Sequence, residues 1–277
     1  MTTIRINPDS CIKCGKCTKV CPANIFEQEE KGYPITICKP EICIVCGHCL
    51  DVCPTGSIKH SEISADKVHP INYENMPSAD QLMELIHARR SNRTMKGAPV
   101  PTDKLEKIVE AGRYAPTARN TRQVTITVIN DPEKLKQVQE FTINTFGDMV
   151  KKLENPFVKL FMKATHPEYY DFIPAFYGMK KAYENGKDPI LRNSSAIIAF
   201  TTPTDNFGEK DSNLAYQNAS LMAQALGVSQ VYLGFVSTAY AKGNQKRIKE
   251  ILGVEGDIHA LMGLGIPTMR YTNYTER

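Results

Sequence analysis

Two matching runs of cysteines are the residues of this chain whose types and spacing could do chemistry. The first run reads Cys11-Ile-Lys-Cys14-Gly-Lys-Cys17-Thr-Lys-Val-Cys21-Pro22, and the second reads Cys43-Ile-Val-Cys46-Gly-His-Cys49-Leu-Asp-Val-Cys53-Pro54. The pattern C-x2-C-x2-C-x3-C-P thus occurs twice, with an offset of 32 residues. Thiolates are strong metal ligands, and four of them at this spacing are typical of iron–sulfur clusters.

The repeat resembles the bacterial two-cluster ferredoxins. In that family, three cysteines of one run bind one cluster, and the fourth cysteine reaches the cluster of the other run. The resemblance therefore implies two 4Fe–4S clusters in the first sixty residues. It assigns one cluster to Cys11, Cys14, Cys17 and Cys53, and the other to Cys43, Cys46, Cys49 and Cys21.

Two other interpretations of the cysteines stay open. Structural zinc takes four ligands, commonly in paired C-x2-C knuckles, which leaves the third cysteine of each run and the following proline without a purpose. A disulfide framework is disfavoured, because nine cysteines are an odd number and nothing marks the chain as secreted. The ninth cysteine, Cys38, lies outside both runs. We expect it to be a small buried residue in a strand over residues 34–38.

Composition sets the broad class. The chain has 277 residues, of which 42% are hydrophobic, so we expect one or two domains with a sizeable core. The formal charge of +4 falls to near zero once about −8 from eight thiolates and about +4 from two oxidised cluster cores are counted. The charge therefore does not indicate nucleic-acid binding. No apolar run approaches the ~18 residues of a membrane span, and no secretory signal opens the chain, so we expect a cytoplasmic protein.

Beyond residue 60 the sequence predicts a helix-rich domain with scattered strands. Residues 1–60 form the expected ferredoxin-like domain, residues 61–78 a polar linker with several prolines and asparagines, and residues 79–277 the second domain. The absence of a regular βαβ rhythm favours an α+β fold. Apolar periodicity predicts helices over about 79–90, 102–114 (capped by Thr102), 214–226 and 244–252, strands over 121–130, 195–201 and 259–266, and mostly helix over 131–192; residues 231–236 are a strand or the start of a helix.

Four short motifs follow one another in the second domain. They are Arg89-Arg90-Ser91-x-Arg93, Ala115-Pro116-Thr117-x-x-Asn120, Ala225-Leu226-Gly227 and Gly265-x-Pro267-x-x-Arg270. In this order and spacing they resemble the nitroreductase family of FMN enzymes over most of residues 79–277. The resemblance implies a homodimer with one FMN per subunit in each interface groove.

The resemblance also implies which residues contact FMN. Arg89, Ser91 and Arg93 would bind the phosphate, joined by Arg270, because guanidinium groups and hydroxyls suit a dianion. Arg90 is interpreted as solvent-exposed, since adjacent residues at a helix end face different ways. The remaining positions are Thr117 and Asn120 at the ribityl chain or flavin ring, and the backbone of Leu233 and Gly234 at the pyrimidine. Local turn chemistry and plain core packing are the alternatives for these two pairs.

The chain departs from the family pattern in two places. Many relatives have Gln-Pro-Trp two residues after the Asn of the second motif, whereas Arg122 stands at the Gln position here and the Pro-Trp is missing. A cation near the flavin would favour its anionic reduced form, so we hypothesise that Arg122 raises the flavin potential. The segment 141–188 matches the family poorly. It forms either the variable part of a substrate pocket or a surface helical pair.

The two resemblances together imply an FMN-dependent oxidoreductase. Electrons would pass from the clusters to FMN and on to a nitroaromatic, quinone or activated alkene (enone-type) acceptor. The donor would be NAD(P)H or a reduced ferredoxin-like protein, and a built-in ferredoxin indicates an anaerobic or low-oxygen setting. The alternatives are an electron-transfer relay and a redox sensor, both acting on a protein partner rather than on a small molecule.

Overall fold

Two compact units make up the structure, a computed structural model that describes residues 2–203 and 206–276. The first unit comprises Met1–Met76 and Ala118–Thr121, and the second comprises Pro77–Thr117 and Arg122–Arg277. The outer limits of the two domains expected from the sequence, residues 1 and 277, lie outside the described residues. Among those residues, no helix combines the length and apolar character needed to cross a membrane.

The first unit repeats one small motif. Strand β1 pairs with β4 in one antiparallel sheet, and β2 pairs with β3 in another. The 32-residue offset of the sequence relates β1 to β3, α1 to α2 and β2 to β4, so the structural repeat follows the cysteine repeat. The elements are β1 (Ile4–Ile6), α1 (Lys16–Val20), β2 (Phe26–Glu27), β3 (Thr36–Ile37), α2 (His48–Asp51) and β4 (Ile58–His60).

The core of the first unit is small, and two of its buried members are cysteines. Besides Cys17 and Cys49 it holds five apolar side chains, namely Ile4, Ile25, Phe26, Leu50 and Ile58. The expectation for Cys38 was wrong in part. Its strand is only Thr36–Ile37, and Cys38 follows it half-buried. A hydrogen bond with the Glu27 carboxylate raises the pKa of the Cys38 thiol.

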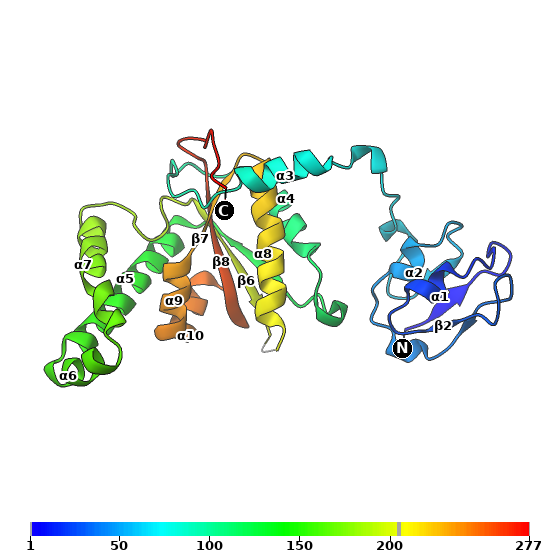
Figure 1. Ribbon diagram of the computed structural model, residues 1–277, viewed down its shortest axis with the longest axis horizontal. Coiled ribbons are helices and arrows are strands. Elements are labelled where there is room, and N and C mark those ends of the chain that lie inside the picture. The colour runs from blue at the N-terminus through cyan, green and yellow to red at the C-terminus, as the bar shows by residue number, and fades with distance from the viewer. Residues whose placement is uncertain (1, 204–205, 277) are drawn as a thin grey trace. The chain divides into compact units, whose positions relative to one another are not determined.

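The second unit is built on a four-stranded antiparallel sheet with the order β5-β6-β8-β7 (Figure 1). Its architecture is the α+β class expected from the sequence. The elements are α3 (Ala79–Ala88), α4 (Thr102–Arg113), β5 (Thr125–Ile129), α5 (Pro132–Glu154), α6 (Pro156–Thr165), α7 (Glu168–Glu184), β6 (Ala196–Thr202), α8 (Gly208–Ala225), β7 (Ser229–Tyr232), α9 (Gly234–Lys242), α10 (Gln245–Leu252) and β8 (Asp257–Gly265).

Helices cover both faces of this sheet. All seven residues of β6 are buried, and successive side chains point to opposite faces. Ile198 and Phe200 pack with residues of α4 and α8, whereas Ile197 and Ala199 pack with residues of α5, α9 and α10. The sheet is therefore the middle layer of three, which explains why its central strands are apolar without alternation.

Element boundaries differ from the sequence expectation where backbone geometry overrides side-chain signals. Thr102 is the first residue of α4 rather than its cap, and Pro101 takes the cap position. Helix α8 begins at Gly208, six residues earlier than expected. Residues 231–236 combine both expected alternatives, because β7 ends at Tyr232 and α9 starts at Gly234.

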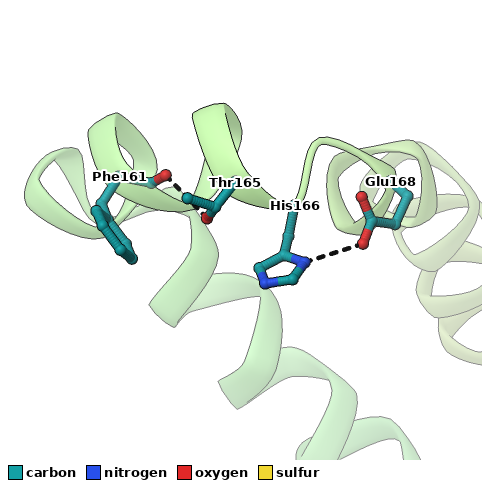
Figure 2. A network of polar contacts seen from close by, with 4 residues as sticks. All are labelled: Phe161, Thr165, His166 and Glu168. Atoms are coloured by element: carbon teal, nitrogen blue, oxygen red, sulfur yellow. Dashed lines mark hydrogen bonds and ion pairs between the residues drawn. The ribbon is translucent and has the colours of Figure 1, made fainter.

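The segment over 141–188 is helical and belongs to α5, α6 and α7. Helix α6 buries none of its side chains, and Phe157 and Leu160 are 87% and 83% exposed. Figure 2 shows the last turn of α6, where Thr165 donates to the carbonyl of Phe161, and the following turn, where the His166 ring faces the Glu168 carboxylate. His166 Nδ1 lies 3.2 Å from Glu168 Oε1. The backbone N–H of Glu168 and then His166 hold the pKa of that carboxyl below its ordinary value.

The layered packing predicts how truncation of single leucines affects stability. Leu261 lies in β8 with no exposed surface, so Leu261→Ala should lower the free energy of unfolding by about 3 kcal/mol through lost burial and a cavity. Leu160→Ala, at an exposed site on α6, is the control and should change it by less than about 0.5 kcal/mol. Urea unfolding followed by far-ultraviolet circular dichroism measures both, and equal effects would contradict the packing described.

Candidate functional site

The eight motif cysteines surround two separate cavities in the first unit. One cavity is lined by Cys11, Cys14, Cys17 and Cys53, and encloses about 330 Å³ of atom-free space, including the part open to solvent. The other is lined by Cys21, Cys43, Cys46 and Cys49, and encloses about 340 Å³ by the same measure. Each cavity thus takes three cysteines from one run and the fourth from the other run. This is the grouping that the ferredoxin resemblance implies.

The local backbone explains how each run wraps its cavity. Gly15 and Gly47 adopt left-handed conformations with φ of 71° and 81°, and a helix starts directly after each of them. Residues with a side chain rarely adopt such angles, so glycine lets the chain turn between the second and third cysteines. The helices α1 and α2 then carry the third cysteine of each run, Cys17 and Cys49, into the interior.

Backbone and side-chain groups donate hydrogen bonds to the cysteine sulfurs. The amide of Ile25 donates to Cys21 Sγ at 3.4 Å, and the equivalent amide of Ser57 donates to Cys53 Sγ at 3.3 Å. Burial raises the pKa of Cys53, but hydrogen bonds from Thr55 and neighbouring amides outweigh it, so the pKa lies below its ordinary value. These donors favour sulfur in its anionic, ligating form.

The two deeply placed cysteines behave in the opposite way. Burial, followed by the neighbouring Cys46, raises the pKa of Cys49 to about 11. Burial likewise raises the pKa of Cys17. A metal must therefore displace a proton at both positions. Within the described part of the chain, no three His, Cys, Asp or Glu side chains form a site for a single metal ion. The four thiols of each set surround an open volume instead, and such a volume suits a cluster with several iron atoms.

A histidine contacts one of the ligand sulfurs. His60 at the end of β4 is buried, and its Nε2 lies 3.4 Å from Cys43 Sγ. Burial lowers the pKa of His60, which keeps the imidazole neutral. The sequence interpretation did not include this residue, because it lies seven residues beyond the last motif cysteine.

In the second unit, two arginines line one cavity with about 820 Å³ of atom-free space, again including the part open to solvent. Arg90 and Arg270 contribute cations, while Asn92 and Ser229 contribute polar groups. The interpretation of Arg90 as a solvent-exposed residue was wrong: its side chain is half-buried and faces this cavity. Arg270, which the resemblance assigns to the FMN phosphate, lies in the same cavity lining. Two guanidinium groups beside one concave surface suit a phosphate dianion.

Asn92 ties together the segments that form this cavity. Its Nδ2 donates to Ser229 Oγ at 2.9 Å, and its Oδ1 accepts from the amide and hydroxyl of Thr94. The backbone N–H of Asn92 donates to the carbonyl of Gln230. The neighbouring Ser91 forms a parallel β-bridge with Gln230, which lies in β7. These hydrogen bonds hold the segment after α3, which carries the Arg89–Arg93 motif, against β7.

The other arginines of the first motif lie differently. Arg89 is half-buried, and its charge acts on Tyr216, whose pKa is raised, chiefly by burial. Tyr216 therefore stays protonated and donates to Gln230 Oε1 at 2.7 Å. Arg93 is exposed and donates to the carbonyl of Ser91.

The turn over residues 117–122 has an unusual backbone. Arg119, Asn120 and Arg122 all have positive φ, between 51° and 55°. The Thr117 hydroxyl accepts from the amide of Arg122 at 3.0 Å, which closes the turn. The turn Ala118–Asn120 groups with the first unit, where the Asn120 amide donates to the carbonyls of Ile44 and Val45 at 3.0 and 2.9 Å. Positive φ in three non-glycine residues stores strain of the kind found at functional sites. The flavin roles of Thr117, Asn120 and Arg122 stay predictions.

Leu233 and Gly234 lie where β7 passes into α9. Leu233 is buried, and its amide donates to the carbonyl of Leu261. Gly234 is exposed, and a Cβ built on it would meet no described atom within 4 Å. In the described structure, no side chain caps the N-terminus of α9. Gly234 thus leaves free space beside the backbone at the start of α9.

A unit with two four-cysteine cavities, joined to an α/β/α-layered unit with a cation-lined cavity, defines a class of two-module redox protein. The chain belongs to the nitroreductase family, whose model matches residues 86–266. Residues 4–57 match the 4Fe-4S dicluster domain family. The second match lies in the first unit, and the first match lies in the second unit except for residues 118–121.

The chain is also similar to curated proteins. The chain is 25% identical over 187 residues to the FMN reductase [NAD(P)H] of Bacillus subtilis, covering 68% of this chain and 65% of that protein. It is 23% identical over 191 residues to an NADPH-dependent oxidoreductase of Staphylococcus saprophyticus, covering 68% and 66%. The chain thus spans just under two thirds of the length of these relatives.

The solved structures share the fold of the second unit. A nitroreductase with bound FMN from Bacteroides fragilis superimposes with a TM-score of 0.53 at 19% identity, covering 71% of this chain and 95% of that one. A BluB-like flavoprotein from Clostridium difficile gives a TM-score of 0.54 at 16% identity, covering 71% and 94%. At these identities the likeness shows the fold.

The cavity linings predict which cysteines are needed for iron. Cys14→Ser and Cys46→Ser should each remove about half of the iron, because each residue lines one cavity. Cys38→Ser is the matched control and should leave the iron content unchanged, since Cys38 lines neither cavity. Iron analysis of protein purified without oxygen measures all three. Iron loss from Cys38→Ser equal to that from Cys14→Ser would contradict the assignment.

Proposed function

We propose that this chain is an FMN-dependent oxidoreductase that takes electrons through two 4Fe–4S clusters to FMN and passes them to a small acceptor. The observation that carries the proposal is the presence of three suitable sites in one chain: two four-cysteine cavities and one cavity lined by Arg90 and Arg270. Nitroaromatics, quinones and activated alkenes are the proposed acceptor classes.

The residues of each site have distinct tasks in this proposal. The eight thiolates hold the iron, and the amides of Ile25 and Ser57 stabilise their charge. Arg90 and Arg270 bind the FMN phosphate, with Asn92 holding their segments in place. The open backbone at Gly234 admits the ring system. FMN, when bound, can take up or give up two electrons together or one at a time. It can therefore exchange electrons with clusters that each carry one electron.

The electron donor and the assembly state complete the proposal. The two curated relatives carry NAD(P)H or NADPH in their names, which supports a nicotinamide donor; a reduced ferredoxin-like protein is the other proposed donor. We also propose a homodimer. In its support, α3 leaves Leu82, Met83 and Ile86 between 42% and 50% exposed on a helix that buries none of its side chains. Apolar surface of this kind is commonly covered by a partner.

The phosphate assignment predicts that two arginines are needed to retain FMN. Arg90→Ala and Arg270→Ala should each weaken FMN binding at least tenfold, since a hydrogen bond to a charged group contributes about 1.5–3 kcal/mol. Iron content should not change. Arg247→Ala is the control, because Arg247 is exposed on α10 and pairs only with Glu250 among the ion pairs found in the described residues. Fluorescence of released flavin measures binding, and full FMN retention in both variants would place the phosphate elsewhere.

The reductase activity is tested by anaerobic reoxidation. The fully reduced holoprotein is mixed with one equivalent of a nitroaromatic at a time, while cluster and flavin absorbance are followed together. Both bands should reoxidise in step with loss of the nitro compound. In the double variant Cys14→Ser, Cys46→Ser only the flavin band should respond. If both bands of the unaltered protein stay reduced, the small-acceptor function fails, and a relay to a protein partner becomes the better explanation.

A further inference from the structure

One of the two four-cysteine cavities is lined by a buried histidine, and the other is not. His60 is 7% exposed and lines the cavity of Cys21, Cys43, Cys46 and Cys49. Its position is fixed by the pairing of β4 with β1, in which His60 lies opposite Ile4. From there its Nε2 is 3.4 Å from Cys43 Sγ, within range of a hydrogen bond to sulfur.

The hydrogen on this imidazole can be placed from its other contact. The backbone amide of Glu62 donates to His60 Nδ1 at 3.0 Å, so Nδ1 is an acceptor and carries no hydrogen. A neutral imidazole has one N–H, which must then be on Nε2. A cysteine that binds iron has lost its own proton. The contact is therefore an N–H···S hydrogen bond that His60 donates to Cys43.

The internal repeat shows that this bond is specific to one half of the unit. The 32-residue offset relates Cys43 to Cys11 and His60 to Gln28. The Gln28 Nε2 donates instead to the carbonyls of Lys13 and Tyr33 at 3.0 and 2.8 Å. The side chain at this repeat position thus donates a hydrogen bond to a cysteine sulfur in one half and to the loop backbone in the other.

We propose that His60 is a positioning residue that raises the reduction potential of the cluster bound by Cys21, Cys43, Cys46 and Cys49. The proposal rests on the proposed iron–sulfur function. Reduction adds one electron to the cluster, and no bond breaks and no proton moves. The added negative charge spreads onto the sulfur ligands, so a donor to one of them stabilises the reduced form more than the oxidised form.

The other cluster has a hydrogen-bond donor of a different kind. Thr55 Oγ1 lies 3.7 Å from Cys53 Sγ and 2.6 Å from Ser57 Oγ, which in turn accepts from Ser10. Thr55 can therefore donate to Cys53 while it accepts from Ser57. Replacing Thr55 by valine keeps the shape and removes the hydroxyl. It provides a matched variant whose effect should fall on the other cluster.

The test is a potentiometric titration of the full chain, purified without oxygen. Dithionite serves as the one-electron donor, and electron paramagnetic resonance follows both reduced clusters. In His60→Met, one cluster should show about a tenfold lower ratio of reduced to oxidised form at a fixed potential, equal to about 59 mV for one electron. His60→Gln places an amide nitrogen at the same number of bonds from Cα and should recover part of the shift. Thr55→Val should lower the potential of the other cluster only.

The outcomes separate this proposal from the proposed function. If the unaltered protein shows no reduced-cluster signal, the iron–sulfur function itself fails. If both clusters assemble in His60→Met and neither potential moves, or both move equally, the role of His60 is overturned. Should His60→Met lose a cluster, ¹⁵N-histidine-labelled protein that carries His48→Gln decides the question, because His48 also lines this cavity. A weak magnetic coupling of one reduced cluster to that nitrogen supports the hydrogen bond, and its absence overturns it.

Discussion

A thiolate is stable inside a protein only where a metal or a set of hydrogen bonds compensates its negative charge. Cys17 and Cys49 are buried in the first unit, so their thiolate forms need such compensation. With a pKa near 11, Cys49 holds its proton at neutral pH unless a metal displaces it. Strands of two and three residues and seven buried side chains supply little other stabilisation. Binding of the proposed clusters would therefore be coupled to folding of this unit, as is usual for small metal-binding domains.

The second unit depends on a different constraint, the satisfaction of backbone groups at the end of its sheet. The segment after α3 supplies partners for β7 and for the segment after β8, through bridges at Ser91 and Met95. The side chain of the buried Asn92 hydrogen-bonds to all three of these segments, at Thr94, Ser229 and Met269. This arrangement brings Arg90 and Arg270, which are 180 residues apart in the chain, to the same cavity. A cation pair in that position costs self-repulsion, which a bound dianion would relieve.

The sequence was sufficient where a function needs fixed local spacing. The cysteine runs could be read directly, because cluster ligation requires those intervals and glycine at the turn, and the α+β class followed from patterning. The positions of Arg90 and Asn92 could not be read in this way. Whether a residue next to a helix end faces solvent or a cavity depends on the route of the chain after the helix, and bridges to distant strands set that route. His60 was missed for the same reason, since strand pairing between β1 and β4 carries it to Cys43.

The repeat also shows where sequence can vary without loss of ligation. The two runs match at the cysteines, at the glycine of each turn and at the following proline, which are the positions that shape a cluster site. Beyond the runs, the 32-residue offset pairs Gln28 with His60 and Ala23 with Thr55. His60 and Thr55 lie beside cysteine sulfurs, whereas Gln28 donates to the loop backbone. A repeat under a common constraint on its cysteines can thus place different hydrogen-bond donors beside the two sets of sulfurs.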